Sequence, residues 1–507
     1  MNRDSKDAFE TRGLQEEKNA GFVPRKYHKV LRKDYEQWYE QNEAYREAVK
    51  KDPDRLVYHL MPDTGWLNDP NGLCQLNGEY HIYYQYTPFE PTGELKLWGH
   101  YVTKDFVHYT DCAPVLFPDH DFDAHGVYSG SAFVEDGTVH YFYTGNVKYF
   151  DRDDYDYIMA GRGSNTVHCT SRDGFHFTEK ELILTNSDYP DDMSAHIRDP
   201  KILKKDGYYY MVLGARDKDS RGMVLVYRSA DLKNWTYFSR ITTEEPFGYM
   251  WECPDLFWLE GQMYLICCPQ GVTSRGLDFQ NVHQCTVMKT AYDFEKNTYI
   301  IDQTEDIRMV DRGFDFYAPQ TFEDEQGRRI MIGWMGIPDA EYTNPTVKNG
   351  WQHALTIPRV LHTRDGRLIQ EPVEELQQLR RNPRVYSDLT KMQGEKGIVY
   401  EAEIDFSSCE TVKAELRRGV FLEYSDGILS LDPGNCGSGR TIRQVKLESL
   451  RRLRIFSDTS SLEIFVNDGE ETFTSRVYGQ EGKIRINGKC SGTARLYDLA
   501  GFHITKG

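Results

Sequence analysis

The chain has no apolar run long enough to span a membrane, which would take about 18 consecutive apolar residues. The opening residues, MNRDSKD, also lack the apolar core of a secretion signal. We therefore expect a protein that does not associate with the membrane and that works in the cytoplasm.

Patterns typical of disulfide frameworks and metal sites are missing as well. The 10 cysteines are scattered without a Cys-x-x-Cys pair, and the 15 histidines include no His-x-x-x-His pair. This predicts reduced thiols, as in a cytoplasmic enzyme, and neither a metal nor a cofactor. Basic residues are in the minority: the formal net charge is −18, which would repel a polyphosphate, so we expect no nucleic-acid partner.

What the sequence does contain is a repeated hairpin pattern. Each of five units combines a strand-forming segment, a turn built on glycine, and a second segment rich in aromatic or β-branched residues. The turn glycines are Gly78, Gly137, Gly207, Gly261 and Gly327. Segments 104–109, 172–177 and 230–235 resemble the outer hairpins of such units. A period of roughly 50 to 70 residues suits four-stranded blades and predicts a five-bladed β-propeller, whose innermost strands line a central channel.

Three acidic residues stand close to a proline at the head of these units: Asp69, Asp199 and Glu252. An aspartate before a proline is common in turns, so each aspartate alone has a structural explanation. Glutamate is rarely buried unless it is paired or functional, and Glu252 lies between Trp251 and Cys253. We interpret the three acids as occupying equivalent positions of the repeat, where the propeller gathers them in its channel. Cleavage of a glycosidic bond needs two carboxyl groups of different pKa.

The segments that flank the repeats complete the predicted fold. Apolar residues recur with a helical period between residues 27 and 51, which predicts an amphipathic helix within an N-terminal extension, 1–54. The helix face is formed by Leu31, Tyr35, Trp38, Tyr45 and Val49. The propeller is expected over 55–360, a linker with a short helix over 361–384, and a C-terminal β-sandwich over 385–507. The fold class is therefore all-β with a helical extension, and an exposed sandwich edge suits a homodimer contact.

Many motifs resemble those of glycoside hydrolase family 32, the invertase family, which cleaves β-fructofuranosides. They occur in the family's order and cover most of the chain, so the resemblance is specific. The matching segments are Trp66–Gly72, Tyr83–Tyr86, Trp98–His100, Tyr128–Ser131, Arg198–Pro200, Trp251–Asp255, Gly313–Gln320, Gly333–Met335 and Trp351–Arg359, followed by Leu462–Glu470 in the region of the family's sandwich.

The resemblance assigns a role to each of the three acids. Asp69 is expected to be the nucleophile, which forms a fructosyl-enzyme, and Glu252 the general acid and then the general base. Asp199 is expected to hydrogen-bond two fructose hydroxyls in the transition state. Glu252 must then hold a proton near neutral pH, and its apolar neighbours and the nearby acids would raise its pKa. Asp69 must stay ionised, so hydrogen-bond donors should hold it.

The resemblance also implies a sugar pocket around the acids. Asn68 and Gln85 can hydrogen-bond ring hydroxyls, Ser129 offers a small hydroxyl, and Arg198 can offset the excess of carboxylates. Aromatic and apolar side chains would supply the flat surfaces on which sugars stack. The predicted substrate-binding residues are Trp66, Leu67, Asn68, Gln85, Trp98, Tyr128, Ser129, Arg198 and Trp334.

The expected substrate is a small carbohydrate: sucrose, sucrose 6-phosphate or a short fructoside. The sequence does not distinguish free from phosphorylated sucrose. A phosphate would require a cation at the channel mouth, and rim segments carry Lys96, Lys148, Arg152, Arg162 and Lys348. The acidic stretch 151–156 argues against a phosphate there.

Other functions stay open at this point. A fructosyltransferase or a fructan exo-hydrolase would use the same three carboxylates. An arabinan-cleaving propeller shares the fold and the acids, but the motif Trp66–Gly72 favours fructose. A sugar-binding propeller without activity would be expected to lack at least one acid, and all three are present.

Overall fold

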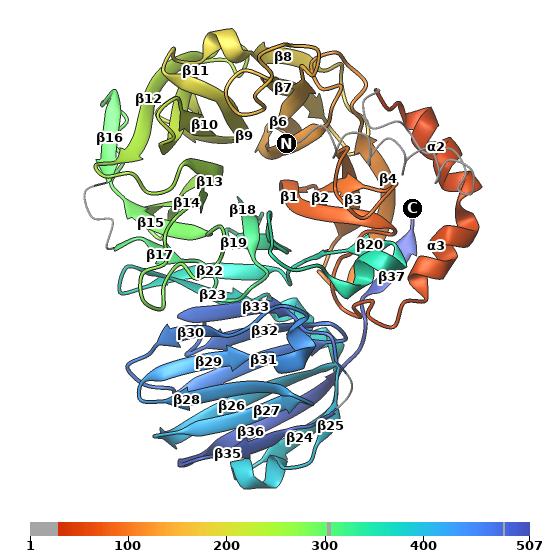
Figure 1. Cartoon of the computed structure of the whole chain (residues 1–507), viewed down its shortest axis with the longest axis vertical. Coiled ribbons are helices and arrows are strands. Elements are labelled where there is room, and N and C mark those ends of the chain that lie inside the picture. The colour runs from red at the N-terminus through yellow and green to blue at the C-terminus, as the bar shows by residue number, and fades with distance from the viewer. Residues whose placement is uncertain (1–28, 302–305, 480–481) are drawn as a thin grey trace.

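The computed structural model describes residues 29–301, 306–479 and 482–507. It contains a ring of five β-sheets with a β-sandwich stacked beneath it (Figure 1). This confirms the predicted class, an all-β chain with a five-bladed propeller, a C-terminal sandwich and N-terminal helices. No helix in these residues is long and apolar enough to cross a membrane.

Four antiparallel strands form the core of each blade, numbered outward from the channel. Three blades run without interruption: β1 (Gly65–Leu76), β2 (Glu79–Thr87), β3 (Leu97–Thr103) and β4 (His108–Leu116); β5 (Val127–Glu135), β6 (Thr138–Lys148), β7 (Arg162–Ser171) and β8 (Glu181–Leu184); β9 (Met193–Lys205), β10 (Tyr208–Asp217), β11 (Gly222–Ser229) and β12 (Thr236–Thr243). The others are β13 (Met250–Leu259), β14 (Gln262–Gln270), β15 (Thr286–Thr290) and β17 (Arg308–Met309), then β18 (Tyr317–Glu323), β19 (Arg329–Met335), β22 (Arg359–Arg364) and β23 (Arg367–Pro372). Short strands β16 (Thr298–Ile301), β20 (Trp351–Gln352) and β21 (Ala354–Leu355) extend them. The innermost strands β1, β5, β9, β13 and β18 contact one another in a closed ring.

Two-residue turns connect the innermost strand to the second strand in four blades. Asn77-Gly78 is one of them, with φ of 53° and 78°, and Asp206-Gly207 is another, with φ of 49° and 81°. Both central residues of such a turn need a positive φ, which asparagine, aspartate and glycine tolerate best. The predicted hairpins are therefore confirmed, and the predicted outer hairpins 104–109, 172–177 and 230–235 lie at the turns β3–β4, β7–β8 and β11–β12.

The propeller extends further along the chain than expected. Residues 361–372 of the predicted linker belong to β22 and β23, the outer strands of the fifth blade. The predicted boundary at residue 360 is therefore too early. The linker is reduced to the short 3-10 helix η4 (Glu374–Leu379), because β24 (Arg380–Tyr386) already pairs within the sandwich.

The sandwich has two main sheets. One contains β24, β36 (Cys490–Leu499), β26 (Tyr400–Cys409), β31 (Arg452–Asp458), β32 (Ser461–Val466) and β33 (Glu471–Arg476). The other contains β30 (Arg443–Lys446), β29 (Ile428–Asp432), β28 (Val420–Ser425), β27 (Val412–Arg417) and β35 (Arg485–Asn487), and β25 (Lys396–Gly397) pairs with β34 (Gly482–Lys483). The last strand, β37 (His503–Lys506), leaves the sandwich and pairs with β4 of the first blade. The chain end assigned to the sandwich thus ties the two domains together.

The N-terminal extension forms two helices, α2 (Arg32–Gln41) and α3 (Glu43–Lys50), where one was predicted. The break falls at Asn42, whose side chain donates a hydrogen bond to the Trp38 carbonyl, 2.8 Å away. Trp38 packs edge-on against Phe89 of the first blade, as expected for the buried face. Leu31 lies outside the helix and is exposed, so its assignment to that face was wrong. Residues 1–28 of the predicted extension lie outside the described residues.

A buried charged network joins the propeller to the sandwich. Arg359 of β22 contacts Glu463 of β32 at 2.6 Å and Asp311 at 3.1 Å. His59, just before the first blade, contacts Asp458 at 2.7 Å and Glu463 at 2.9 Å. Two of the sequence motifs, ending at Arg359 and beginning at Leu462, therefore meet at this interface.

The His59 network predicts a stability that depends on pH. Burial lowers the pKa of His59, but the hydrogen bonds to Asp458 and Glu463 outweigh it and raise the pKa to about 9. The stabilisation by protonated His59 is complete below its unfolded pKa of about 6.5 and is lost as the pH rises through 9. We expect a loss of about 3 kcal/mol in the free energy of unfolding over this window, measured by urea titration.

The variant His59→Gln should lack this part of the pH dependence. His176 offers a matched control, since it contacts Asp173 at 2.7 Å but is exposed, and His176→Gln should behave as wild type. Equal slopes of stability against pH in His59→Gln and wild type would contradict the assignment.

Candidate active site

The innermost strands share one irregularity at the same place. In every blade, the pairing between the innermost strand and the second strand shifts register near the start of the innermost strand. Such a shift marks a β-bulge. The bulges leave Asn68-Asp69, Tyr128-Ser129, Asp199-Pro200, Cys253-Pro254 and Ala318-Pro319 out of the pairing, and Pro70 directly follows the first of them. Proline is tolerated there because the bulge removes the need for a ladder N–H, and bulges redirect side chains next to active sites. The four prolines line one cavity on the channel axis, so the bulges converge.

The acids do not occupy equivalent positions, contrary to the prediction. Asp69 and Asp199 precede the bulge proline directly, but in the fourth blade Cys253 has that place and Glu252 lies one residue earlier. Asp199 and Cys253 both have a positive φ, 62° and 49°. Counted back from the proline, Glu252 therefore corresponds to Asn68 and Arg198 of the other blades. The bulges nevertheless bring all three acids into one connected cluster.

Asp69 is held by two donors within a hydrogen-bond network that draws on three strands, β1, β2 and β5. Asn68 donates its side-chain amide to Asp69 Oδ1 at 3.0 Å and to Gln85 Oε1 at 2.6 Å. The Ser129 hydroxyl donates to Asp69 Oδ2, and Gln85 Nε2 lies 2.6 Å from the Ser129 oxygen. Trp66 Nε1 donates to Asn68 Oδ1 at 2.8 Å and fixes the amide. This network orients the Asp69 carboxylate, and it contains four of the predicted pocket residues.

Asp199 lies between Arg198 and Cys253. Arg198 Nε donates to Asp199 Oδ1 at 2.9 Å, and the backbone N–H of Cys253 donates to Oδ2 at 2.9 Å. The Cys253 thiol lies 3.5 Å from Asp199 and 3.7 Å from Asp69. Burial raises the pKa of this thiol well above its usual value, so it stays protonated and bridges the two carboxylates as a weak donor.

Glu252 is surrounded by four possible donors. Gln270 Nε2 and the Tyr317 hydroxyl lie 2.9 Å and 3.0 Å from Oε2. His196 Nε2 and Arg198 Nη1 lie 3.3 Å and 3.5 Å from Oε1. These groups come from β9, β14 and β18, so the environment of Glu252 depends on three blades. It is polar, although Trp251 and Cys253 suggested an apolar one.

The expected order of pKa values is reversed in this arrangement. Burial alone would raise the pKa of Glu252, but Arg198, His196 and Tyr317 outweigh it and lower the pKa to about 2. Burial raises the pKa of Asp69 despite the donors Ser129 and Asn68. Burial also raises the pKa of Asp199 to about 6, against the effect of Arg198. The prediction of a raised pKa for Glu252 was wrong, because the donors that stabilise its carboxylate lie far away in sequence.

Removing the Tyr317 hydroxyl should therefore shift the pH–rate profile. Tyr317→Phe deletes one hydrogen bond to the Glu252 carboxylate, a bond worth about 1.5 to 3 kcal/mol for a charged acceptor. The pKa of Glu252 rises, so its protonated form persists to higher pH. We expect the alkaline limb of kcat/KM to move up by about one pH unit.

A control with the same chemistry lies on the outside of the molecule. The Tyr209 hydroxyl donates to Glu135, and Tyr209→Phe should leave the profile in place. A Tyr317→Phe profile that stays unchanged or moves to lower pH would contradict the role of this hydroxyl.

Aromatic side chains form one wall of the site. The Trp66 ring lies 4.3 Å from His353 and 5.8 Å from Trp334, measured between ring centroids. Tyr128 is half-buried and packs against the Arg198 guanidinium, 5.0 Å from its ring centroid. These three predicted residues lie next to the network around Asp69 and Asp199.

Two predicted pocket residues lie in the core instead. Trp98 is fully buried against Tyr83 and Tyr141 and has no free face for a sugar. Its indole N–H donates to the Tyr128 carbonyl at 3.2 Å, so it supports the strand that carries Ser129. Leu67 is also fully buried, and its side chain packs in the propeller core. Their substrate-binding assignment was wrong, because alternate residues of a strand point to opposite faces.

Sequence reasoning missed three neighbours of Glu252: His196, Gln270 and Tyr317. Tyr317 lies within the motif Gly313–Gln320, to which the sequence gave no role for this side chain. It lies two residues before Pro319, the place that Asn68, Arg198 and Glu252 have before the prolines of their blades. Comparing the residues before these prolines could have found Tyr317. His196 carries no such signal.

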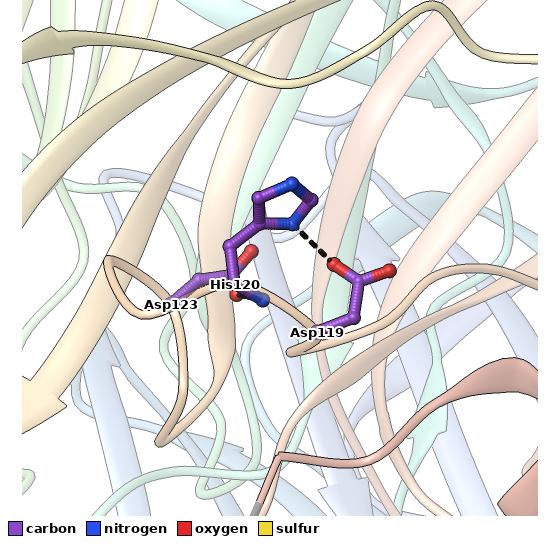
Figure 2. A group of neighbouring side chains, drawn as sticks. All are labelled: Asp119, His120 and Asp123. Carbon is purple, nitrogen blue, oxygen red and sulfur yellow. Dashed lines mark hydrogen bonds and ion pairs between the residues drawn. The ribbon is translucent and has the colours of Figure 1, made fainter.

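One group of side chains in the described residues has the composition of a metal site. Asp119, His120 and Asp123 lie together in the loop between β4 and β5 (Figure 2), with His120 Nδ1 2.7 Å from Asp119 Oδ1. However, the Lys180 ammonium contacts Asp119 at 2.6 Å and Asp123 at 2.8 Å. Since this cation already forms ion pairs with both carboxylates, we interpret the group as a structural ion-pair cluster.

Comparison with known proteins covers nearly the whole chain. Residues 59–372 match the Glycosyl hydrolases family 32 N-terminal domain, and residues 375–500 match the Glycosyl hydrolases family 32 C terminal. The chain is 35% identical to a sucrose-6-phosphate hydrolase of Bacillus subtilis over 89% of this chain and 96% of that protein. It is 37% identical to a sucrose-6-phosphate hydrolase of Staphylococcus xylosus over 90% and 95% of the two chains.

Solved structures resemble the fold just as extensively. The sucrose-6-phosphate hydrolase from Lactobacillus gasseri aligns with a TM-score of 0.83 and 29% identity, covering 93% of this chain and 100% of that one. A Bombyx mori GH32 beta-fructofuranosidase, solved as a mutant in complex with sucrose, aligns with a TM-score of 0.79 and 27% identity, covering 94% and 99%.

Proposed function

This chain belongs to glycosyl hydrolase family 32, and we propose that it is a retaining β-fructofuranosidase that hydrolyses sucrose, sucrose 6-phosphate or short fructosides. The observation that carries the proposal is the cluster of Asp69, Asp199 and Glu252 at the convergent bulges of three blades. One acid is oriented by neutral donors and another is surrounded by four donors. Such an asymmetric pair of carboxyl groups suits double displacement at a sugar carbon.

In the first step, the Asp69 carboxylate attacks the anomeric carbon of the fructosyl unit. The donors Asn68 and Ser129 hold the carboxylate in one orientation, which lowers the entropy cost of attack. Glu252 gives its proton to the glycosidic oxygen as that bond breaks, so the products are the free aglycon and a fructosyl ester on Asp69.

Asp199 links the protonation of Glu252 to the arrival of the sugar. Its pKa of about 6 places a proton on the acid cluster at mildly acidic pH. Fructosyl hydroxyls that donate to Asp199 would stabilise its ionised form. The proton that the acid cluster shares would then bind preferentially to Glu252.

In the second step, ionised Glu252 takes a proton from water, and the resulting hydroxide attacks the ester and regenerates Asp69. The four donors around Glu252 favour the ionised form that this step needs. The configuration at the anomeric carbon is inverted twice and is therefore retained.

The names of the relatives point to a small, phosphorylated sugar as substrate. Both bacterial relatives act on sucrose 6-phosphate by name. We propose a cytoplasmic location, which all 10 cysteines support because they are unpaired in this chain. A homodimer through the sandwich edge stays a prediction.

Product analysis tests the function directly. Purified protein with sucrose should release equal amounts of glucose, or glucose 6-phosphate from the phosphorylated substrate, and free fructose. Accumulation of trisaccharides at high sucrose would identify a transferase. Activity on fructans only would identify an exo-hydrolase, and no release from any fructoside would contradict the proposal.

A further inference from the structure

A pair of cations lies beside the acid cluster, and neither forms an ion pair with a carboxylate of residues 29–301, 306–479 or 482–507. Lys148 ends β6 and Arg162 begins β7, and the two residues face each other across the strand pair. Both lie on the ring of Tyr157, with Arg162 Cζ at 4.0 Å and Lys148 Nζ at 5.5 Å from its centroid. We call Lys148, Tyr157 and Arg162 the cationic cluster.

Arg162 is the unusual member of this cluster. It is buried, with only 2% of its surface exposed. Its Nε and Nη2 atoms have no hydrogen-bond partner in the described part of the chain. A buried guanidinium without a counter-ion is costly, because charge transfer out of water is repaid only by a paired anion. The site is therefore built to receive negative charge from outside the chain.

The position of the cluster relative to Glu252 suggests which part of a substrate it meets. Two residues beyond Arg162, the Ser164 hydroxyl donates to the carbonyl of Ala195, the residue before His196, at 2.6 Å. Burial and, to a smaller extent, Arg162 lower the pKa of the His196 imidazole to about 3. His196 in turn contacts Glu252 at 3.3 Å. On the other flank, Tyr128 packs on Arg198, which holds Asp199. Because Glu252 protonates the leaving group in the proposed function, the cluster lies on the leaving-group side.

The acidic stretch 151–156, which argued against a phosphate, does not neutralise the cluster. Its side chains are exposed, Asp154 pairs with Arg152 at 2.8 Å, and Asp156 caps the backbone N–H of Ile158 and Met159. Asp154 and Asp156 are therefore engaged by groups of the loop itself, and no carboxylate of the stretch forms an ion pair with Lys148 or Arg162 among the described residues.

We propose that Lys148 and Arg162 bind the phosphate of a 6-phosphorylated leaving group and make this chain selective for sucrose 6-phosphate over sucrose. Arg162 would donate two charge-assisted hydrogen bonds to the phosphate oxygens, and Lys148 would add a point charge at the partly exposed side. The Tyr157 ring holds both cations in place. This inference rests on the proposed function and adds the residues that set its specificity.

The test compares kcat/KM on sucrose 6-phosphate and on sucrose in wild type, Lys148→Gln and Arg162→Gln. We expect wild type to prefer the phosphate by about tenfold or more, as charge-assisted phosphate binding would give. Each variant should lose most of that preference through a higher KM for sucrose 6-phosphate, while its activity on sucrose stays within about threefold of wild type. Arg152→Gln is the matched control, since Arg152 is an exposed rim cation already paired with Asp154, and it should keep the wild-type preference.

Each outcome decides the matter. A wild type that cleaves both substrates equally, or variants that lose activity on both in equal measure, would overturn the phosphate site. A wild type that cleaves neither would instead overturn the proposed function. If Arg162→Gln does not fold because Arg162 is buried, the substrate preference of Lys148→Gln still tests the proposal, since Lys148 is partly exposed.

Inhibition of sucrose hydrolysis adds a test of binding alone. Glucose 6-phosphate should compete at lower concentration than either glucose or inorganic phosphate, and Lys148→Gln should remove the advantage. Equal inhibition by inorganic phosphate and glucose 6-phosphate would indicate a general anion site and overturn the proposal.

Discussion

Asp69→Asn is expected to lower kcat by about four orders of magnitude or more, the loss seen when a nucleophile that acts as one unit with its partners is removed. The amide cannot form the fructosyl ester, although its shape is almost that of the carboxylate. Asn68 and Ser129 would still surround the side chain, so the fold and the affinity for sucrose should change little. The measurement is single-turnover and steady-state kinetics, with thermal unfolding to check the fold.

An aspartate-to-asparagine substitution outside the site controls for effects of the substitution on folding and on charge. Asp136 lies in the turn between β5 and β6 with a φ of 49°, a conformation that asparagine accepts well. Asp136→Asn should therefore have wild-type activity. If Asp69→Asn kept more than about a tenth of wild-type kcat, well above the loss expected for a nucleophile, Asp69 would not be the nucleophile.

Glu252→Gln is the second large effect, and its size should depend on the leaving group. General acid catalysis contributes about 10² to 10⁴-fold, and sucrose needs it because glucose leaves poorly without a proton. A 4-nitrophenyl fructoside needs almost no protonation, so its fructosyl transfer to Asp69 should fall far less. The second step still lacks its base, so a burst of nitrophenol followed by slow turnover is expected.

The leaving-group comparison separates catalysis from structure. In Glu252→Gln, the side-chain amide has only one oxygen and can no longer accept hydrogen bonds as the carboxylate does from Gln270, Tyr317 and His196. A structural disturbance from this change would reduce the rates with both substrates alike. Equal losses on sucrose and on the nitrophenyl fructoside would contradict the acid–base assignment.

The propeller architecture could be predicted from the sequence because each repeat is defined by local features, the residue types of its turns and strands. Asn77-Gly78 and Asp206-Gly207 adopt the two-residue turns that their residue types require. The position of the acids in the channel followed from the repeat, but their register did not. One residue separates Glu252 from the position of Asp199. The sequence already contains this offset, since Cys253 lies between Glu252 and Pro254, and the strand pairing confirms it.

The electrostatics of the site could not be predicted from neighbours in sequence. Trp251 and Cys253 flank Glu252 and suggested an apolar environment, yet its donors His196, Gln270 and Tyr317 come from other strands. Similarly, a tryptophan at a motif position can face either side of its strand, and Trp98 faces the core. Contacts between blades determine both the polarity around Glu252 and the direction of the Trp98 side chain. These contacts cannot be derived from the sequence alone.

The most direct test is to trap the covalent intermediate. Glu252→Gln is mixed with 4-nitrophenyl fructoside, quenched in acid within the burst, digested and analysed by mass spectrometry. We predict that the peptide from β1 carries one fructosyl unit on Asp69 and that Asp69→Asn/Glu252→Gln carries none. A burst without a labelled peptide, or a label on Asp199 or any other residue, would contradict a retaining mechanism through Asp69.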